Sequence, residues 1–80
     1  MLKSDGMNDK NGREYLLTLG KKIRTARVDK NLSQQALADL CDIEKSNLSR
    51  MESGKINPTI LTLRKISEQL FAHFHEIFEE

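Results

Sequence analysis

A run of hydrogen-bonding side chains without a single acid lies near the middle of the chain. Five of the six residues from 45 to 50 are polar: Lys45, Ser46, Asn47, Ser49 and Arg50. Amide, hydroxyl, ammonium and guanidinium groups are the ones that bond to base edges in the major groove of DNA and to phosphate oxygens. The run therefore has the chemistry of a surface that contacts nucleic acid, and Arg50 suits either a guanine or a phosphate.

Two short helices around a tight turn would present this run to a partner. Ser33 is predicted to cap the first helix, because its hydroxyl can accept a hydrogen bond from a free amide of the first turn. The second helix is predicted to begin after Glu44, which is a weaker cap. Residues 41–43 leave room only for a turn, and Asp42 tolerates the left-handed conformation that such a turn often needs. We interpret residues 34–54 as a helix-turn-helix.

Longer helices on either side must hold this pair. Apolar residues at three- and four-residue spacing predict a helix from about residue 13 or 14 to 29 or 30, which Asn31 ends in a left-handed conformation. Its buried stripe consists of Leu16, Leu19, Ile23 and Ala26. Gly54 can end the second short helix. A further helix is predicted to start near Pro58 or Thr59. Its core face consists of Ile60, Leu63, Ile66, Ser67 and Leu70.

The charges of the chain separate a basic body from an acidic tail. The net charge is only +1, but residues 10–65 hold twelve lysines and arginines against six acids. Residues 66–80 hold four glutamates and no lysine or arginine. Such a division is consistent with one face that meets DNA and one that points away. It is also consistent with charges that only solvate helix surfaces.

Three segments together resemble the phage-repressor-type helix-turn-helix family, the XRE-like group that includes the Cro and repressor proteins. They are residues 32–38 (Leu-Ser-Gln-Gln-Ala-Leu-Ala), residues 48–55 (Leu-Ser-Arg-Met-Glu-Ser-Gly-Lys) and Pro58. The resemblance covers roughly residues 19–78 and implies an all-α, five-helix lambda-repressor-like domain. We expect that domain over residues 13–80, after a flexible segment over residues 1–12.

The resemblance also implies roles for individual residues. An arginine at position 27 of such a domain commonly pairs with the glutamate at position 52, so we expect an Arg27–Glu52 ion pair. Gln34 matches a glutamine that commonly holds a phosphate and braces the recognition helix. Ser53, Lys55 and Asn57 would meet the DNA backbone, beside the recognition-helix residues named above.

All three phenylalanines lie at the end of the chain, where a domain this small cannot bury every apolar side chain. We expect a self-complementary dimer surface there. Its residues would be Leu61, Phe71, Phe74, Ile77 and Phe78. The alternative is that these residues cap the core of a monomer. His73, His75 and Glu76 form a weak metal constellation, because residues two apart on a helix point in different directions.

These features predict a homodimeric regulator that binds double-stranded DNA at a palindromic operator, of the phage or plasmid repressor or restriction–modification controller type. The rival interpretation is a protein-interaction adaptor or antitoxin-like module on the same fold. We find no nucleophile–base set, and expect no enzyme activity, metal, cofactor, small-molecule ligand or membrane association. The one cysteine, Cys41, excludes an internal disulfide and is consistent with a reducing cytoplasm.

Overall fold

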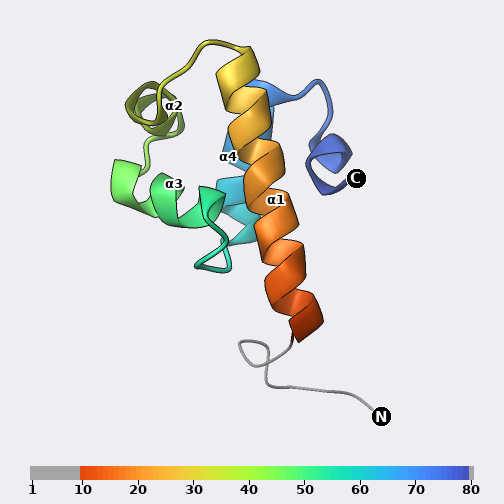
Figure 1. Cartoon of the computed structure of the whole chain (residues 1–80). Coiled ribbons are helices and arrows are strands. Elements are labelled where there is room, and N and C mark those ends of the chain that lie inside the picture. Colours follow the sequence, from red (N-terminus) through yellow and green to blue (C-terminus); the bar gives the residue numbers. More distant parts are fainter. Residues whose placement is uncertain (1–9, 80) are drawn as a thin grey trace.

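The computed structural model describes residues 10–79, and within them the protein is built from helices alone. Four α-helices precede a 3₁₀-helix at the C-terminal end (Figure 1). Their bounds are α1 Lys10–Asp29, α2 Gln34–Cys41, α3 Lys45–Glu52, α4 Ile60–Leu70 and η2 Phe74–Phe78. The prediction of an all-α domain is confirmed. The fifth helix of that prediction is a 3₁₀-helix.

The start of the first helix differs from the prediction. The expected flexible segment over residues 1–12 overlaps α1 at residues 10–12, so the helix begins three residues before the predicted start at residue 13. Residues 1–9 lie outside the described residues. None of residues 10–12 is a strong helix breaker except Gly12, and a single glycine costs an α-helix only about 1 kcal/mol relative to alanine. The long helix therefore begins nearly two turns before Leu16, the first residue of its apolar stripe.

Local side-chain chemistry explains where α2 and α4 begin. The Ser33 hydroxyl accepts a hydrogen bond from the Ala36 amide at 3.0 Å, and the Thr59 hydroxyl accepts one from the Thr62 amide at 3.2 Å. Each hydroxyl satisfies an amide that has no partner inside its helix. Glu44 is the N-cap of α3 but makes no side-chain capping bond.

Left-handed residues end the first three helices and set the turns between them. Asn31 has φ 60°, Asp42 has φ 56° and Gly54 has φ 73°. The turn between α2 and α3 is closed by the Asp42 and Ile43 amides, which donate to the Asp39 and Ala38 carbonyls. The three conformations agree with the predictions made for these residues. Asp42, which lies between α2 and α3, sets the angle at which α3 leaves α2.

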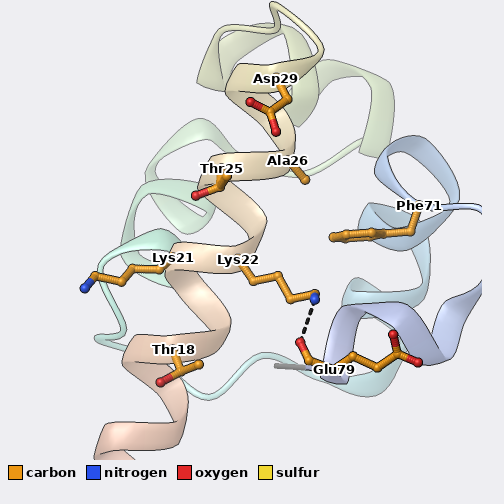
Figure 2. Close-up of a pocket in the computed structure, with 8 residues that line it drawn as sticks. All are labelled: Thr18, Lys21, Lys22, Thr25, Ala26, Asp29, Phe71 and Glu79. Carbon is orange, nitrogen blue, oxygen red and sulfur yellow. Dashed lines mark hydrogen bonds between the residues drawn. The ribbon is translucent and has the colours of Figure 1, made fainter.

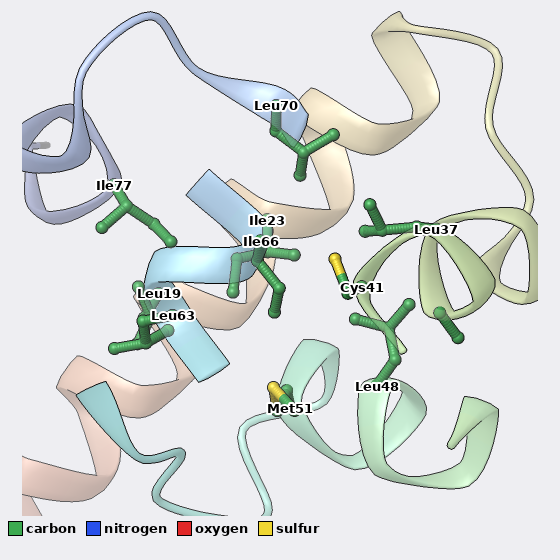
Figure 3. Close-up of a cluster of buried hydrophobic side chains, with 11 residues drawn as sticks. Leu19, Ile23, Leu37, Cys41, Leu48, Met51, Leu63, Ile66, Leu70 and Ile77 are labelled. Atoms are coloured by element: carbon green, nitrogen blue, oxygen red, sulfur yellow. The ribbon is translucent and has the colours of Figure 1, made fainter. Parts of the chain in front are cut away.

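The core gathers apolar side chains from every helix (Figure 3). The buried hydrophobic residues are Leu19, Ile23, Leu37, Ala38, Cys41, Leu48, Met51, Leu63, Ile66, Leu70 and Ile77. Ile60 was predicted to lie on the core face of α4, but it is 58% exposed. It is the first residue of that helix and lies beyond the end of the core, so correct periodicity does not bury it.

Helices α1 and α3 approach each other closely at Gly20. A Cβ atom at this position would overlap the carbonyl oxygens of Met51 and Glu52, at the C-terminal end of α3. These obstacles are backbone atoms, which cannot turn aside as a flexible side chain can. Any residue larger than glycine would push α3 away from α1, so Gly20 sets the distance between the two helices.

The C-terminal segment leaves α4 through an extended stretch and packs against the core through one buried side chain. Phe71 and His73 have extended backbones, which end α4 and start η2. Ile77 then enters the core and is only 1% exposed. This corrects the prediction that Ile77 contributes to a dimer surface, because its side chain is already used inside the monomer.

No helix among residues 10–79 is long and apolar enough to span a bilayer.

Candidate nucleic-acid interface

Helix α3 separates its side chains into two faces. Leu48, Met51 and Glu52 point inward and are buried. The outer face consists of the five predicted contact residues, Lys45, Ser46, Asn47, Ser49 and Arg50, and all of them are exposed. The fold therefore brings these five together on one surface, with no acidic side chain among them. We call this surface the recognition face.

The predicted ion pair holds α3 from behind. Arg27 Nε and Nη2 donate to the two carboxylate oxygens of Glu52 at 2.7 and 3.0 Å. Its remaining nitrogen, Nη1, donates to the Leu32 carbonyl at 2.6 Å. Both charged residues are 8% exposed. The fork of the guanidinium matches the carboxylate, so the pair fixes orientation as well as distance.

Gln34 joins the same network from the start of α2. Its Nε2 donates to Glu52 Oε1 at 2.9 Å, so this carboxylate accepts three hydrogen bonds in all. No buried side-chain nitrogen or oxygen within residues 10–79 lacks a hydrogen-bond partner. Gln34 thus braces the recognition helix, as the resemblance implied. Its expected phosphate contact stays a prediction.

Two further hydrogen bonds organise the recognition face. Arg50 Nη2 donates to Asn47 Oδ1 at 3.4 Å, which is a long and weak bond between two exposed side chains. The Ser53 hydroxyl donates to the Ser49 carbonyl at 3.0 Å and lies beside the end of the helix. Arg50 is therefore held loosely and can exchange Asn47 for a base or a phosphate at little energetic cost.

The loop after α3 carries the remaining predicted contacts. Lys55 and Asn57 are exposed, and the Lys55 amide is already used by the Arg50 carbonyl at 2.9 Å. The Lys55 side chain makes no hydrogen bond or ion pair within the described residues. It is available to a phosphate, whereas its own backbone amide is not.

A hollow of about 420 Å³ lies where α1, α2 and α3 meet, next to the recognition face. Its lining residues are Arg24, Arg27, Gln34, Ser49, Glu52 and Ser53. Three of these were predicted to contact DNA, but Arg24 was not. The signal was present in the sequence, because Arg24 precedes Arg27 by three residues and so lies on the same side of α1.

The other side chains that could bind a metal ion or react as nucleophiles are few. No group of three histidines, cysteines or acids that could hold a metal ion occurs in the described part of the chain. Cys41 is buried, and burial raises the pKa of its thiol, which disfavours the reactive thiolate. His73 and His75 lie side by side with stacked rings on the exposed C-terminal segment.

Comparison with known proteins identifies the family to which this chain belongs. A family model described as helix-turn-helix matches residues 23–77. Control protein C.BamHI from Bacillus amyloliquefaciens is 38% identical over 55 residues, which are 68% of each chain. Control protein C.MunI from a Mycoplasma species is 32% identical over 65 residues, which are 80% of this chain and 88% of that protein.

A solved structure agrees with these sequence matches. The restriction-modification controller protein C.AhdI from Aeromonas hydrophila superimposes with a TM-score of 0.76 at 30% identity. The match covers 79% of this chain and 96% of that one. The helices that form the hollow and the recognition face are thus shared with a controller protein over nearly its whole length.

Proposed function

This chain belongs to the helix-turn-helix family, and from that premise we propose that it is a cytoplasmic, homodimeric regulator of transcription of the restriction–modification controller type. The observation that carries the proposal is the recognition face. It is an acid-free polar surface on a helix that a buried, fully hydrogen-bonded ion pair holds in place. The similarity to three control proteins favours the controller type over the repressor, adaptor and antitoxin types.

The recognition helix would enter the major groove with its first turn against the bases. Lys45, Ser46 and Asn47 lie at that end and supply donors and acceptors for base edges. Gln34, Ser53, Lys55 and Asn57 surround it and would hold phosphates. Phosphate contacts fix the register of the protein on the duplex, whereas base contacts supply the sequence preference.

The dimer is proposed to form through the exposed apolar residues of the C-terminal part. Leu61 is 65% exposed, and Phe74 and Phe78 are each 37% exposed. The two phenylalanine rings contact each other edge to face at 5.3 Å between centroids. Phe71 packs partly against the core and would contribute its remaining surface. Two-fold symmetry would then place the recognition helices about one turn of DNA apart, roughly 34 Å.

Selection of bound sequences from a pool of random duplexes at a fixed salt near physiological strength, about 150 mM, tests the proposal. We expect an enriched two-fold motif with half-sites about ten base pairs apart. A folded protein that enriches no sequence would overturn the proposal and favour the adaptor type. An enriched motif without two-fold symmetry would keep the DNA-binding function and remove the dimer.

Two variants then separate base contacts from phosphate contacts. Asn47→Ala should cost about 1–3 kcal/mol of binding free energy on the selected sequence and relax the preference at one base position. Lys55→Ala should weaken binding to selected and random duplexes alike and reduce the slope of log K against log salt by about one. Equal losses on both kinds of duplex for both variants would contradict the assigned roles.

A further inference from the structure

The hollow between α1, α2 and α3 holds one charge that the monomer leaves uncompensated. Of its charged lining residues, Arg27 and Glu52 neutralise each other through two hydrogen bonds. The third, Arg24, is exposed and its side chain makes no hydrogen bond or ion pair with any residue that the structure describes. The hollow therefore carries a net charge of one guanidinium.

The other lining groups suit an anion as well. The Ser49 hydroxyl can donate a hydrogen bond, and the Ser53 hydroxyl can donate one by turning away from the Ser49 carbonyl, which it contacts at 3.0 Å. Gln34 is the first residue of α2. The Ser33 hydroxyl accepts from the Ala36 amide, and the Ser33 carbonyl accepts from the Leu37 amide. The amides of Gln34 and Gln35, at the first two positions of α2, have no partner inside the helix. Amides at such an end, together with the helix dipole, favour a negative charge nearby.

We propose that Arg24, with Gln34 and Ser53, forms a binding site for one phosphate of the DNA backbone at the edge of the recognition face. The inference rests on the proposed function and adds a contact from α1, a helix that is otherwise outside the interface. DNA is the favoured source of the phosphate because Ser49 belongs to both the hollow and the recognition face. A DNA strand that flanks α3 would therefore place a phosphate near Arg24.

Arg24→Gln is the decisive variant, with Arg64→Gln as its matched control. Both changes remove one exposed guanidinium and so lower the net charge equally. Arg64, however, lies on α4, which does not line the hollow, and it pairs with Glu68 at 3.3 Å. Neither residue is buried, so thermal unfolding of the two variants should stay close to that of the parent chain.

The measurement is affinity for the selected duplex over a series of salt concentrations. Arg24→Gln should weaken binding about tenfold and reduce the salt slope by about 0.9, which is the value for one lost phosphate contact. Arg24→Lys, which keeps the charge, should restore the slope while losing a few-fold in affinity, because lysine lacks the guanidinium fork. Arg64→Gln should leave both quantities near those of the parent.

Equal behaviour of Arg24→Gln and Arg64→Gln on DNA that the parent chain binds would overturn this inference and leave the proposed function intact. A parent chain that binds no duplex would instead remove the proposed function. Titration with inorganic phosphate in the absence of DNA separates the two sources of the anion. If free phosphate stabilises the parent chain but not Arg24→Gln, and DNA binding is the same in both, the site serves a free anion and the proposal is wrong.

Discussion

Two regions of this small domain, the recognition helix α3 and the C-terminal segment, are attached to the core by different kinds of contact. The recognition helix is fixed from inside, by a buried ion pair, a glutamine brace and the close approach of α1 at Gly20. The C-terminal η2 segment is held mostly by contacts at the surface of the protein. It depends on one buried side chain, Ile77, and on exposed hydrogen bonds such as Lys22 Nζ to the Glu79 carbonyl at 2.5 Å (Figure 2).

The difference is consistent with the role that we propose for each region. A helix that reads bases must keep its side chains within a narrow range of positions, and a buried bidentate pair supplies such precision. The proposed dimer surface needs exposed apolar area, because the buried core of a homodimer interface is largely apolar. The C-terminal segment offers that area, because most of its anchoring hydrogen bonds involve backbone groups and the Phe74 and Phe78 rings stay partly exposed.

The largest expected effect comes from breaking the inner network. Glu52→Ala leaves the buried Arg27 guanidinium without its partner, so the free energy of unfolding should fall by about 3–5 kcal/mol. Replacing Arg27 and Glu52 together by methionine should recover most of this loss, since neither charge is then stranded. Urea unfolding of the parent, the single and the double variant measures both quantities. A double variant no more stable than Glu52→Ala would contradict this account of the network.

The C-terminal anchor should give an intermediate effect. Ile77→Ala opens a cavity in the core and should cost about 2–4 kcal/mol of unfolding free energy. The neighbouring Phe78→Ala removes an exposed ring and its edge-to-face contact, so the monomer should lose about 1 kcal/mol or less.

For association of the proposed dimer, Phe78→Ala should have a larger effect than Ile77→Ala, which is the opposite of their order for unfolding free energy. In sedimentation velocity over a concentration series, Phe78→Ala should shift association to higher concentrations, because it removes apolar area from the proposed contact. If Ile77→Ala leaves the monomer as stable as Phe78→Ala does, the division between a buried anchor and an exposed surface is wrong.

The smallest effect concerns acid. The Glu76 carboxylate accepts hydrogen bonds from the Ala72 and His73 amides at 3.0 Å each, and the His73 amide bond above all holds the pKa of Glu76 below its ordinary value of 4.5. A lowered pKa in the folded protein adds stability that is present above pH 4.5 and is lost as the pH falls through the lowered value.

Glu76→Gln should therefore remove part of the acid sensitivity of the C-terminal segment. Because Glu76 is only partly buried, the difference from the parent chain should be small and confined to the pH range below about 4.5. Hydrogen exchange of the η2 amides as a function of pH measures it. A parent and a variant that respond identically to acid would show that the carboxylate does not hold this segment.

Sequence reasoning succeeded best where local chemistry decides the structure. The cap at Ser33, the left-handed residues and the Arg27–Glu52 pair depend on residue type at a given spacing, or on a motif that the family shares. The two-faced character of α3 likewise follows from the helical period. These features position most of the recognition face, so its residues could be chosen before the structure was known.

It failed where packing between distant segments decides. No glycine or proline marks the end of α4, so the extended backbone at Phe71 and His73 could not be predicted, and the fifth helix became a 3₁₀-helix. The burial of Ile77 and the exposure of Ile60 depend on where the core ends, which periodicity does not show. The spacing of Arg24 from Arg27 places both residues on one side of α1, but only the hollow that three helices form together shows what Arg24 faces.

The two faces of α3 have a consequence for how such a protein can acquire a new target. The side chains that hold the helix in the fold, Leu48, Met51 and Glu52, are separate from the five that face outward. Substitutions among the outward five leave the core and the ion pair untouched, so they carry little cost in stability. Binding preference can thus drift through single changes while the scaffold stays constant, and one frame can serve many operators.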